Sequence, residues 1–408
     1  MASLASAARI APTAALAPRR ASRASRASRR ASAAPVRAAA PAYDEVFDGN
    51  TGQMVKTLSQ SVETVSAGGL DWSYRLGVPE EGVETKPNKV LLVHGAGLVS
   101  YTYSKLMREL QLKGYECYAP DMPGHGATSK PAPGGFKYDA AAYQGALDAF
   151  IAETGIAAGE QIDLIVSGFF TSQVRAATSR AALLALPRFL VSASAPPPRP
   201  VSIPRLTLPA RACPRQAALL LAASKPETFR RVVVMNMPLA NGHKLPDPLA
   251  VYSRPFGMGK GAKADVSKLA YFGNEFAIPE ERMAEYEKPH AGADAEAARA
   301  ALEATATADF KGLMASVSKA FQSRGGPKVR VVWGSADKYL NDAPMYNWCD
   351  EVRASFDVMR KVGHMPQEDF PEDAAKYAAS FFESERKATA LGSVRLGKID
   401  KDDDYDRS

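Results

Sequence analysis

The sequence predicts an α/β fold, in which a mostly parallel sheet of eight strands carries helices on both faces. Short apolar runs alternate with segments whose apolar residues recur at helical spacing. Such alternation is typical of parallel strands joined by helical crossovers. The chain has 408 residues, of which 46% are hydrophobic and 23% charged, so it is long enough to bury a large core.

The expected strands begin with a hairpin and continue as short buried runs. Their sequences, in chain order, are VETVSAGG, LDWSYRLGV, NKVLLVHG, YECYAPDMPG, QIDLIVSG, RRVVVMNMPL, KVRVVWGSAD and SFDVMRKVGH. Helical spacing predicts helices in YTYSKLMRELQLKGY and YDAAAYQGALDAFIAETG, each closed by a glycine, and in PEDAAKYAASFFES, which has proline at its start.

Residues 241–315 interrupt the alternation. Loops rich in glycine, proline and lysine precede two segments rich in alanine, which predicts a helical cap over one end of the sheet after the sixth strand. The cap would divide the core into a first part, 39–240, and a second part, 316–383. The polar stretch 384–408, which ends in KIDKDDDYDRS, is expected to be a disordered tail.

Residues 1–38 are expected to be a transit peptide. The first 40 residues contain eight arginines and no acidic residue, and they lack the apolar core of a secretory signal. The sequence around Ala38 and Ala39 resembles a chloroplast processing site, so we expect cleavage between them and a chloroplast location. Serine-arginine repeats leave the mitochondrion as the alternative destination, and a solvated disordered tail is the plain alternative to a transit peptide.

A second unusual tract covers residues 174–216. It contains seven arginines, no acidic residue and a proline cluster, and it shows neither helical nor strand periodicity. The tract also separates GFFTSQ from AALLLAASKPETF, which together would form one helix. Codons for its first residue, valine, and its last, glutamine, can match the two ends of an intron, and its length keeps the reading frame. Our hypothesis is therefore that the tract is a retained intron. A genuine surface or disordered insertion is the alternative. Sequencing the transcript would distinguish the two.

Charge and composition exclude several classes of protein. The formal net charge of +7 comes from these two arginine-rich tracts, so the remaining chain is acidic and a nucleic-acid partner is not expected. No apolar run approaches the ~18 residues that cross a bilayer. Three cysteines, Cys117, Cys213 and Cys349, do not make a disulfide scaffold or a zinc pattern, and they favour a reducing compartment. No metal and no organic cofactor are expected, because the glycine pairs are too short for a dinucleotide fingerprint.

Four of the expected strands end in distinctive residues, at the edge of the sheet where ligands of such folds bind. These ends read HGAG at 94–97, DMPGHG at 121–126, WGSAD at 333–337 and GH at 363–364, the last followed by QED at 367–369. In this order they resemble the α/β-hydrolase family over Ser59–Phe382, apart from the 174–216 tract. The cap and the DMPGHG loop resemble the haloalkane dehalogenase and epoxide hydrolase branch, and GFFTSQ resembles a plant and algal plastid subgroup of it.

The resemblance assigns roles to individual residues. It implies that Asp337 is the acid that orients an imidazole and that His364 is the general base. It implies that the backbone N–H of Ala96 is an oxyanion donor. The plain alternatives are a helix N-cap for Asp337 and a hydrogen-bonded surface histidine for His364. Loop-forming roles are expected for four further residues: His94, Asp121, Gly124 and Gly126.

The nucleophile position departs from the family pattern of G-x-S-x-G. Aligning the fifth strand places Gly168 where the nucleophile should stand, with the bulky Val166 and Phe170 at the small flanking positions. Glycine cannot form a covalent intermediate. Ser167 and Ser172 are the alternative nucleophiles, although Ser167 should point away from the site. Phe169 is expected to supply the second oxyanion N–H and to line the substrate pocket.

Two functions follow, each with a small organic molecule as substrate or ligand. The first is an enzyme that uses the Asp337–His364 pair to activate water or to move a proton, without a covalent nucleophile. The second is a catalytically degenerate fold that binds a small ligand or a protein. An ordinary esterase with a displaced serine is a third reading.

Overall fold

The computed structural model describes residues 40–48, 52–132, 134–168, 214–240, 274, 276, 278–306, 310–323 and 325–384. The chain divides into two units, Met1–Ala38 and Ala39–Ser408, and all described residues belong to the second. The expected transit peptide, the 174–216 tract up to residue 213 and the tail after Ser384 lie outside the described residues. Their expected properties therefore stay predictions.

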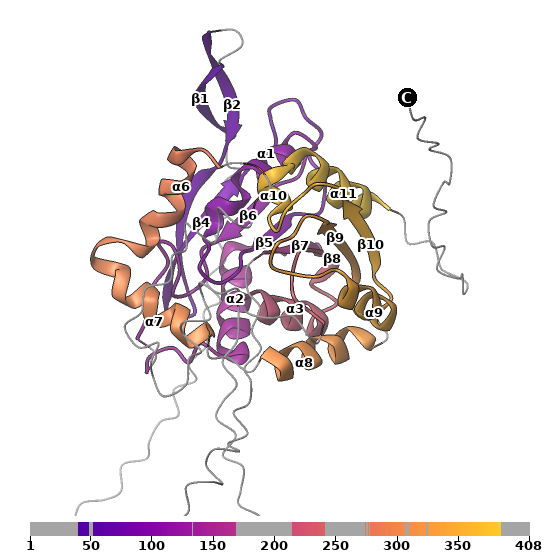
Figure 1. The fold of residues 1–408 in the computed structure, drawn as a ribbon. Coiled ribbons are helices and arrows are strands. Elements are labelled where there is room, and N and C mark those ends of the chain that lie inside the picture. Colours follow the sequence, from indigo (N-terminus) through magenta and orange to yellow (C-terminus); the bar gives the residue numbers. More distant parts are fainter. Residues whose placement is uncertain are drawn as a thin grey trace, which may run out of the picture. The chain divides into compact units, whose positions relative to one another are not determined.

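Eight strands form one sheet, in the order β10-β9-β8-β7-β5-β6-β4-β3 (Figure 1). All neighbours from β10 to β6 are parallel, whereas β4 is antiparallel to both β6 and β3. The predicted mostly parallel, eight-stranded sheet is therefore confirmed. The strands are β3 (Ser61–Ala67), β4 (Leu70–Gly77), β5 (Val90–Val93), β6 (Cys117–Pro120), β7 (Ile162–Ser167), β8 (Phe229–Met235), β9 (Lys328–Gly334) and β10 (Ser355–Met359).

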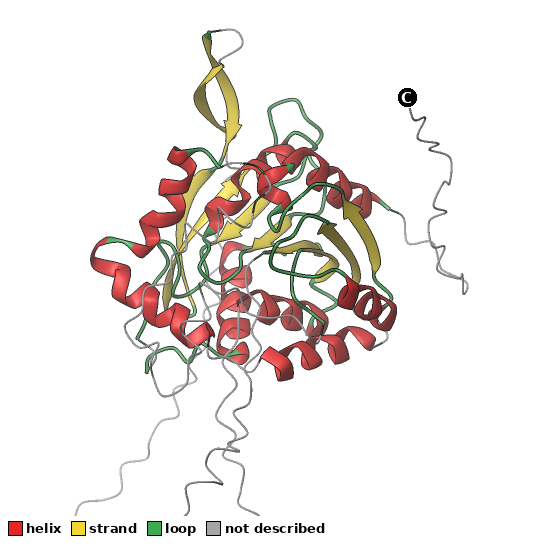
Figure 2. Cartoon of the chain, in the orientation of Figure 1, coloured by secondary structure: helices red, strands yellow, loops and turns green. Residues whose placement is uncertain are grey.

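Helices cover both faces of this sheet (Figure 2). In β5, Leu91 and Val93 belong to one hydrophobic cluster and Val90 and Leu92 to the other, because successive strand side chains point to opposite faces. The first cluster includes residues of α2 (Ala140–Thr154), α3 (Pro214–Ser224), α8 (Phe310–Gln322) and α9 (Ala343–Val352), and the second includes residues of α1 (Ser104–Gln111) and α11 (Pro371–Glu383).

The ends of α2 follow from local sequence. Asp139 accepts a hydrogen bond from the N–H of Ala142 at 2.8 Å, which satisfies one of the free donors in the first turn. Gly155 ends the helix in the left-handed conformation, with φ of 64°, which glycine adopts without steric cost. The predicted closure of this helix by glycine is confirmed.

Helix α3 begins at Pro214, so its first turn contains the last three residues of the 174–216 tract. Ala217, Ala218 and Leu219 are fully buried. The helix predicted from AALLLAASKPETF is therefore present. Its expected continuation into GFFTSQ falls outside the described residues.

A two-stranded antiparallel ribbon precedes the sheet and was not predicted. It consists of β1 (Ala42–Asp48) and β2 (Gln53–Ser59) and belongs to a sheet of its own (Figure 1). Met54 is 58% exposed and Val55 is 37% exposed. Because the ribbon buries so little apolar surface, its sequence carries no strong strand signal.

The described part of the cap is helical, as predicted. It comprises α6 (Glu280–Glu287), the short 3₁₀ turns η4 (Lys288–His290) and η5 (Gly292–Asp294), and α7 (Ala295–Ala306). A Cβ on Gly124 would lie 2.6 Å from the Cβ of Ala301 in α7, so glycine allows the cap to approach the loop after β6. Helix α8 runs across the boundary expected at residue 315 and packs with α3 and α9 in the first cluster.

Candidate functional site

The carboxyl ends of β8, β9 and β10 bring three polar side chains together: Asn236, Asp337 and His364. His364 donates a hydrogen bond from Nδ1 to Oδ2 of Asp337 over 2.7 Å, and each side chain is only 1% exposed. Asn236 donates to the same oxygen from Nδ2 at 2.7 Å. A buried carboxylate held in this way can orient an imidazole and stabilise its charged form.

Further bonds keep Asp337 ionised. Its Oδ1 accepts hydrogen bonds from the N–H of Tyr339 at 2.8 Å and of Leu340 at 3.0 Å. Burial by itself would raise the pKa of Asp337, but the charge and hydrogen bond of His364 and the bonds from Asn236 and Tyr339 outweigh burial and hold the pKa below its ordinary value. The pair therefore has a carboxylate that stays negative beside the imidazole.

Asn236 was not identified from the sequence. It lies just after β8 with φ of 39°, and its Oδ1 accepts a hydrogen bond from the N–H of Gly334 at 2.7 Å. Asn236 therefore ties the end of β8 to the end of β9 as well as to Asp337. The sequence signal for Asn236 is its position alone, as a polar residue directly after the apolar run VVVM.

Close packing of two loops allows the Asp337–His364 contact. A Cβ on Gly334 would lie 2.1 Å from the carbonyl oxygen of Gly363 and 2.5 Å from that of Val362. The WGSAD glycine is therefore needed where the loops after β9 and β10 approach each other. The ring of Tyr339 packs edge-on against the imidazole of His364, with 5.5 Å between centroids.

Gly168 directly follows β7. Its φ is 61°, a conformation that non-glycine residues adopt at a cost. Its N–H donates to the carbonyl oxygen of Met235 at 3.1 Å. Phe169 and Phe170 lie outside the described residues, as does Ser172.

Ser167 points to the face of the sheet opposite to that of Val166, as the alternation of strand side chains predicts. Its side chain is fully buried, and Oγ donates to the hydroxyl of Tyr103 at 2.9 Å. The Tyr103 hydroxyl in turn donates to the carbonyl oxygen of Val93 at 2.8 Å. The geometry gives Ser167 a structural bond on the α1 side and does not place it beside His364.

The loop after β5 places Ala96 at the same edge of the sheet. Ala96 is 1% exposed, in a turn closed by a hydrogen bond from the N–H of Leu98 to the carbonyl oxygen of Gly95 at 3.2 Å. The ring of His290, in the cap, donates from Nε2 to the carbonyl oxygen of Gly97 at 3.0 Å. The cap therefore contacts the loop expected to supply the oxyanion donor.

His94 is bonded on both ring nitrogens to the surrounding loops. Nδ1 donates to the carbonyl oxygen of Gly95 at 2.7 Å, and Nε2 accepts from the N–H of Met122 at 2.9 Å. Burial lowers the pKa of His94 to about 4, so the ring is neutral at physiological pH. This geometry agrees with the loop-forming role expected of His94.

Asp121 likewise organises a loop. Oδ1 accepts from the N–H of Ser100 at 2.7 Å and Oδ2 from that of Ala127 at 3.0 Å. A Cβ on Gly126 would lie 2.0 Å from Oδ2 of Asp121. The DMPGHG motif therefore folds around this carboxylate.

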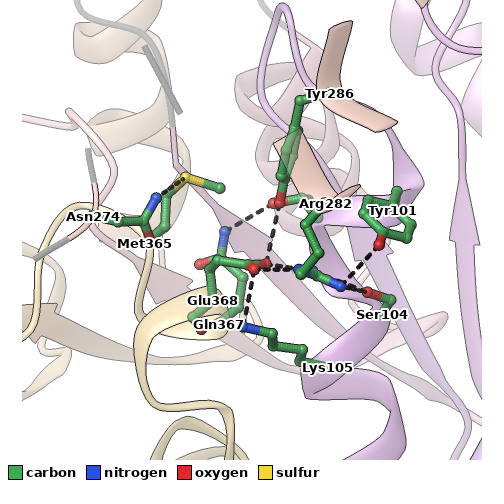
Figure 3. A network of polar contacts seen from close by, with 10 residues as sticks. Tyr101, Ser104, Lys105, Asn274, Arg282, Tyr286, Met365, Gln367 and Glu368 are labelled. Atoms are coloured by element: carbon green, nitrogen blue, oxygen red, sulfur yellow. Dashed lines mark hydrogen bonds and ion pairs between the residues drawn. The ribbon is translucent and has the colours of Figure 1, made fainter. Parts of the chain in front are cut away.

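A second polar network joins the cap to the loop that carries His364 (Figure 3). Arg282 of α6 forms two hydrogen bonds with the carboxylate of Glu368, from Nε to Oε1 and from Nη2 to Oε2, each of 2.6 Å. Lys105 lies 3.0 Å from the same carboxylate, and the Tyr286 hydroxyl donates to it at 3.2 Å. Glu368 lies in α10 (Pro366–Asp369) and its side chain is 2% exposed. Glu368 belongs to the QED motif at 367–369, whereas no sequence pattern indicates Arg282 as its partner.

The described residues contain no group of three or more histidine, cysteine, aspartate or glutamate side chains placed to hold a metal ion. No helix in the described part of the chain has the length and apolarity needed to cross a membrane.

Comparisons with known proteins agree with this architecture. The sequence model of the alpha/beta hydrolase family matches residues 90–377. Among solved structures, the haloalkane dehalogenase DbeA from Bradyrhizobium elkani superposes with a TM-score of 0.56 at 19% identity, covering 79% of this chain and 97% of that one. The haloalkane dehalogenase DatA from Agrobacterium tumefaciens gives 0.56 at 16% identity, with 79% and 96% covered.

A putative lipase from Acinetobacter baumannii gives a TM-score of 0.53 at 17% identity, covering 79% of this chain and 91% of that one. At these identities the neighbours show the shared fold alone. A search of curated protein sequences found no match. Because the family model covers more than half of the chain, the protein belongs to the alpha/beta hydrolase family.

Proposed function

We propose that this protein is a plastid enzyme that hydrolyses a small organic substrate, or moves a proton on it, with the Asp337–His364 pair and without a covalent nucleophile. The observation that carries the proposal is the buried 2.7 Å bond between Nδ1 of His364 and Asp337, combined with glycine at position 168. An intact acid–base pair, together with glycine at the position where the sequence alignment places the nucleophile, favours activation of water.

The chemistry follows from these groups. Nε2 of His364 removes a proton from water while the water oxygen bonds to the electrophilic carbon of the substrate. The backbone N–H groups of Ala96 and Phe169 are the expected donors to the negative oxygen that forms when that carbon is a carbonyl. The imidazolium then returns the proton to the leaving group. Asp337 stays ionised throughout and stabilises the charged ring.

A binding module is the second candidate, because Gly168 removes the covalent nucleophile of the family. In that case the Asp337–His364 pair would be structural, and the fold would hold a small ligand or a protein without turnover. The two candidates differ in one measurable property, which is whether any turnover depends on His364.

The test uses the full chain with a panel of esters, epoxides and haloalkanes. Turnover by the wild type that falls about a hundredfold or more in both His364→Ala and Asp337→Asn supports the enzyme. Asp373→Asn is the matched control, because Asp373 is exposed on α11, and it should leave turnover unchanged. Turnover that survives His364→Ala overturns the proposed mechanism, and ligand binding without turnover favours the binding module.

A serine-directed fluorophosphonate tests the third reading, an ordinary esterase with a displaced serine. The wild type should not be labelled, since glycine offers no oxygen to attack phosphorus. Labelling at Ser167 or Ser172 would overturn both candidates and favour an ordinary esterase.

The plastid location rests on the composition of residues 1–38. A fusion of the full chain to a fluorescent protein should accumulate in chloroplasts, with the mature N-terminus at Ala39. Accumulation in mitochondria would favour the alternative destination, and a cytosolic signal would contradict both.

A further inference from the structure

A cavity of about 440 Å³ lies beneath the cap, away from the catalytic pair. We name it the Arg75 pocket. Its walls come from β4, the loops after β5 and β6, and the segment from α6 to η5 of the cap, and its polar lining includes Arg75, Ser100, Tyr101, Asp121, Lys130 and Glu285. Neither Asp337, His364 nor Gly168 lines it. The pocket reaches the sheet edge at Val62, which is 59% exposed.

The alternation of β4 points Arg75 into this pocket. Trp72 and Leu76 belong to the first hydrophobic cluster, with Tyr74 packed against it. Because neighbouring strand residues face opposite sides, Ser73 and Arg75 face the other way, and both line the pocket. Arg75 lies directly between β3 and β6, opposite Val62 and Ala119.

Arg75 and Arg282 contact the same tyrosine but differ in their partners. The guanidinium of Arg282 lies 4.5 Å from the ring centroid of Tyr101, and that of Arg75 lies 4.9 Å from it. Arg282 also forms the two bonds with Glu368 drawn in Figure 3. By contrast, Nε of Arg75 is buried without a hydrogen-bond partner, and among the described residues no acidic group forms an ion pair with Arg75.

The acidic groups of the pocket are already engaged elsewhere. Both oxygens of Asp121 accept backbone N–H groups, Asp294 pairs with Lys130 at 3.2 Å, and Glu285 pairs with Lys288 at 3.7 Å. Burial is the main cause that lowers the pKa of Arg75, against the nearby charges of Asp121 and Glu285. Within the described residues, Arg75 is thus a partly buried cation that faces a cavity without a direct counter-ion.

We propose that the Arg75 pocket binds a small organic monocarboxylate whose carboxylate accepts hydrogen bonds from the guanidinium of Arg75. The planar fork of arginine matches a carboxylate. Of the cations in the lining, Lys130 and Lys288 already pair with Asp294 and Glu285, which leaves Arg75 to bind an anion. The three carboxylates of the pocket walls repel a phosphate dianion more than a ligand with a single negative charge. The apolar part of the ligand would pack against Val99, Pro289 and the Tyr101 ring, which line the same cavity.

The experiment measures binding of hexanoate to the full chain by calorimetry, with hexan-1-ol and inorganic phosphate as comparison ligands. The wild type should bind hexanoate with a Kd of about 1 mM or tighter, and bind hexanol and phosphate at least about tenfold more weakly. Arg75→Met should weaken hexanoate binding about tenfold or more, and Arg75→Lys, which keeps the charge but loses the fork, should lie between.

Two further variants keep the test decisive. Arg108→Met is the matched control, because Arg108 lies on α1, outside the pocket, and pairs with Glu109 at 3.6 Å; it should bind hexanoate as the wild type does. Ala291→Trp places a large ring in the pocket lining and should weaken binding even if Arg75→Met fails to fold.

Three outcomes would overturn the proposal: no hexanoate binding by the wild type, equal binding by folded Arg75→Met, or equal binding of hexanol and hexanoate. Tighter binding of phosphate than of hexanoate would also contradict it. His364→Ala should bind hexanoate like the wild type. The proposal about this pocket can therefore fail or succeed separately from the proposed reaction.

Discussion

The α-carbon of Gly168 faces the side-chain amide of Gln367: a Cβ added to Gly168 would lie 4.0 Å from Nε2 of Gln367 and 3.7 Å from Cδ1 of Leu98. These are ordinary van der Waals distances. Gln367 is fully buried, and its Nε2 donates to the hydroxyl of Thr102 at 3.2 Å. With respect to the described residues, the position after β7 therefore has room for a small side chain, and the main cost of placing one there is backbone strain.

This relationship predicts that Gly168→Ser introduces a reactive serine. The positive φ should lower the free energy of unfolding by about 1–2 kcal/mol, since no clash with the described residues adds to the strain. The variant should be labelled by a fluorophosphonate, and the added mutation His364→Ala should abolish the labelling. Gly168→Ala is the control for strain, and it should stay unlabelled. A folded Gly168→Ser that resists the reagent would show that position 168 is not aligned with His364.

The Arg282–Glu368 pair predicts a strong stability effect. Arg282→Met removes both arginine hydrogen bonds from the buried carboxylate of Glu368, which keeps Lys105 and Tyr286 as partners. We therefore expect a loss of about 2–3 kcal/mol, less than for a buried charge left without any partner. Urea unfolding measures the loss. Lys288→Met is the control, because Lys288 is 76% exposed and its pair with Glu285 is long; its effect should stay within about 0.5 kcal/mol. Equal effects of the two variants would contradict the assignment.

The hydrogen bond from Asn236 to Asp337 predicts how the pH dependence of turnover changes when Asn236 is replaced. Asn236→Ala removes one hydrogen bond that lowers the pKa of Asp337, so that pKa should rise and the acidic limb of the profile should move to higher pH. We expect kcat to fall about tenfold while KM stays unchanged, since the residue acts through Asp337. Asn347→Ala, at an exposed position of α9, should change neither. A rise in KM alone would show that Asn236 contacts the substrate instead.

Two buried histidines predict loss of stability in acid. Burial lowers the pKa of His94 to about 4 and that of His125 to about 3. Unfolding restores a value near 6.5, so the unfolded chain binds more protons below that pH. The contribution of the two neutral rings to the free energy of unfolding is fully present above pH ~6.5. It is lost as the pH falls toward the pKa values of the rings in the folded state.

Each ring should contribute about 2 kcal/mol to the loss between pH 7.5 and pH 5. Urea unfolding at several pH values measures it, and His125→Phe should reduce the pH dependence by the share of one histidine. A free energy of unfolding that is constant over this range would contradict the neutral, buried assignment of both rings.

Local patterns were enough to predict the sheet. The apolar runs VLLV and LIV and the helices closed by glycine read directly from the sequence, because burial on both faces of a strand requires consecutive apolar side chains. The ribbon β1–β2 was missed since it buries little surface and so leaves little pattern. The strand-end motifs at Asp337 and His364 were also visible, because parallel strands collect their carboxyl ends at one edge.

The sequence by itself determined the succession of strands and helices along the chain, the family and the glycine at position 168. Only the tertiary structure decided which polar groups meet: Asn236 with Asp337, Arg282 with Glu368, and Arg75 with an open cavity. The partners in the first two pairs are 101 and 86 residues apart in the chain. No periodicity records such contacts, because they arise from the distances between folded elements and from the need of buried charges for partners.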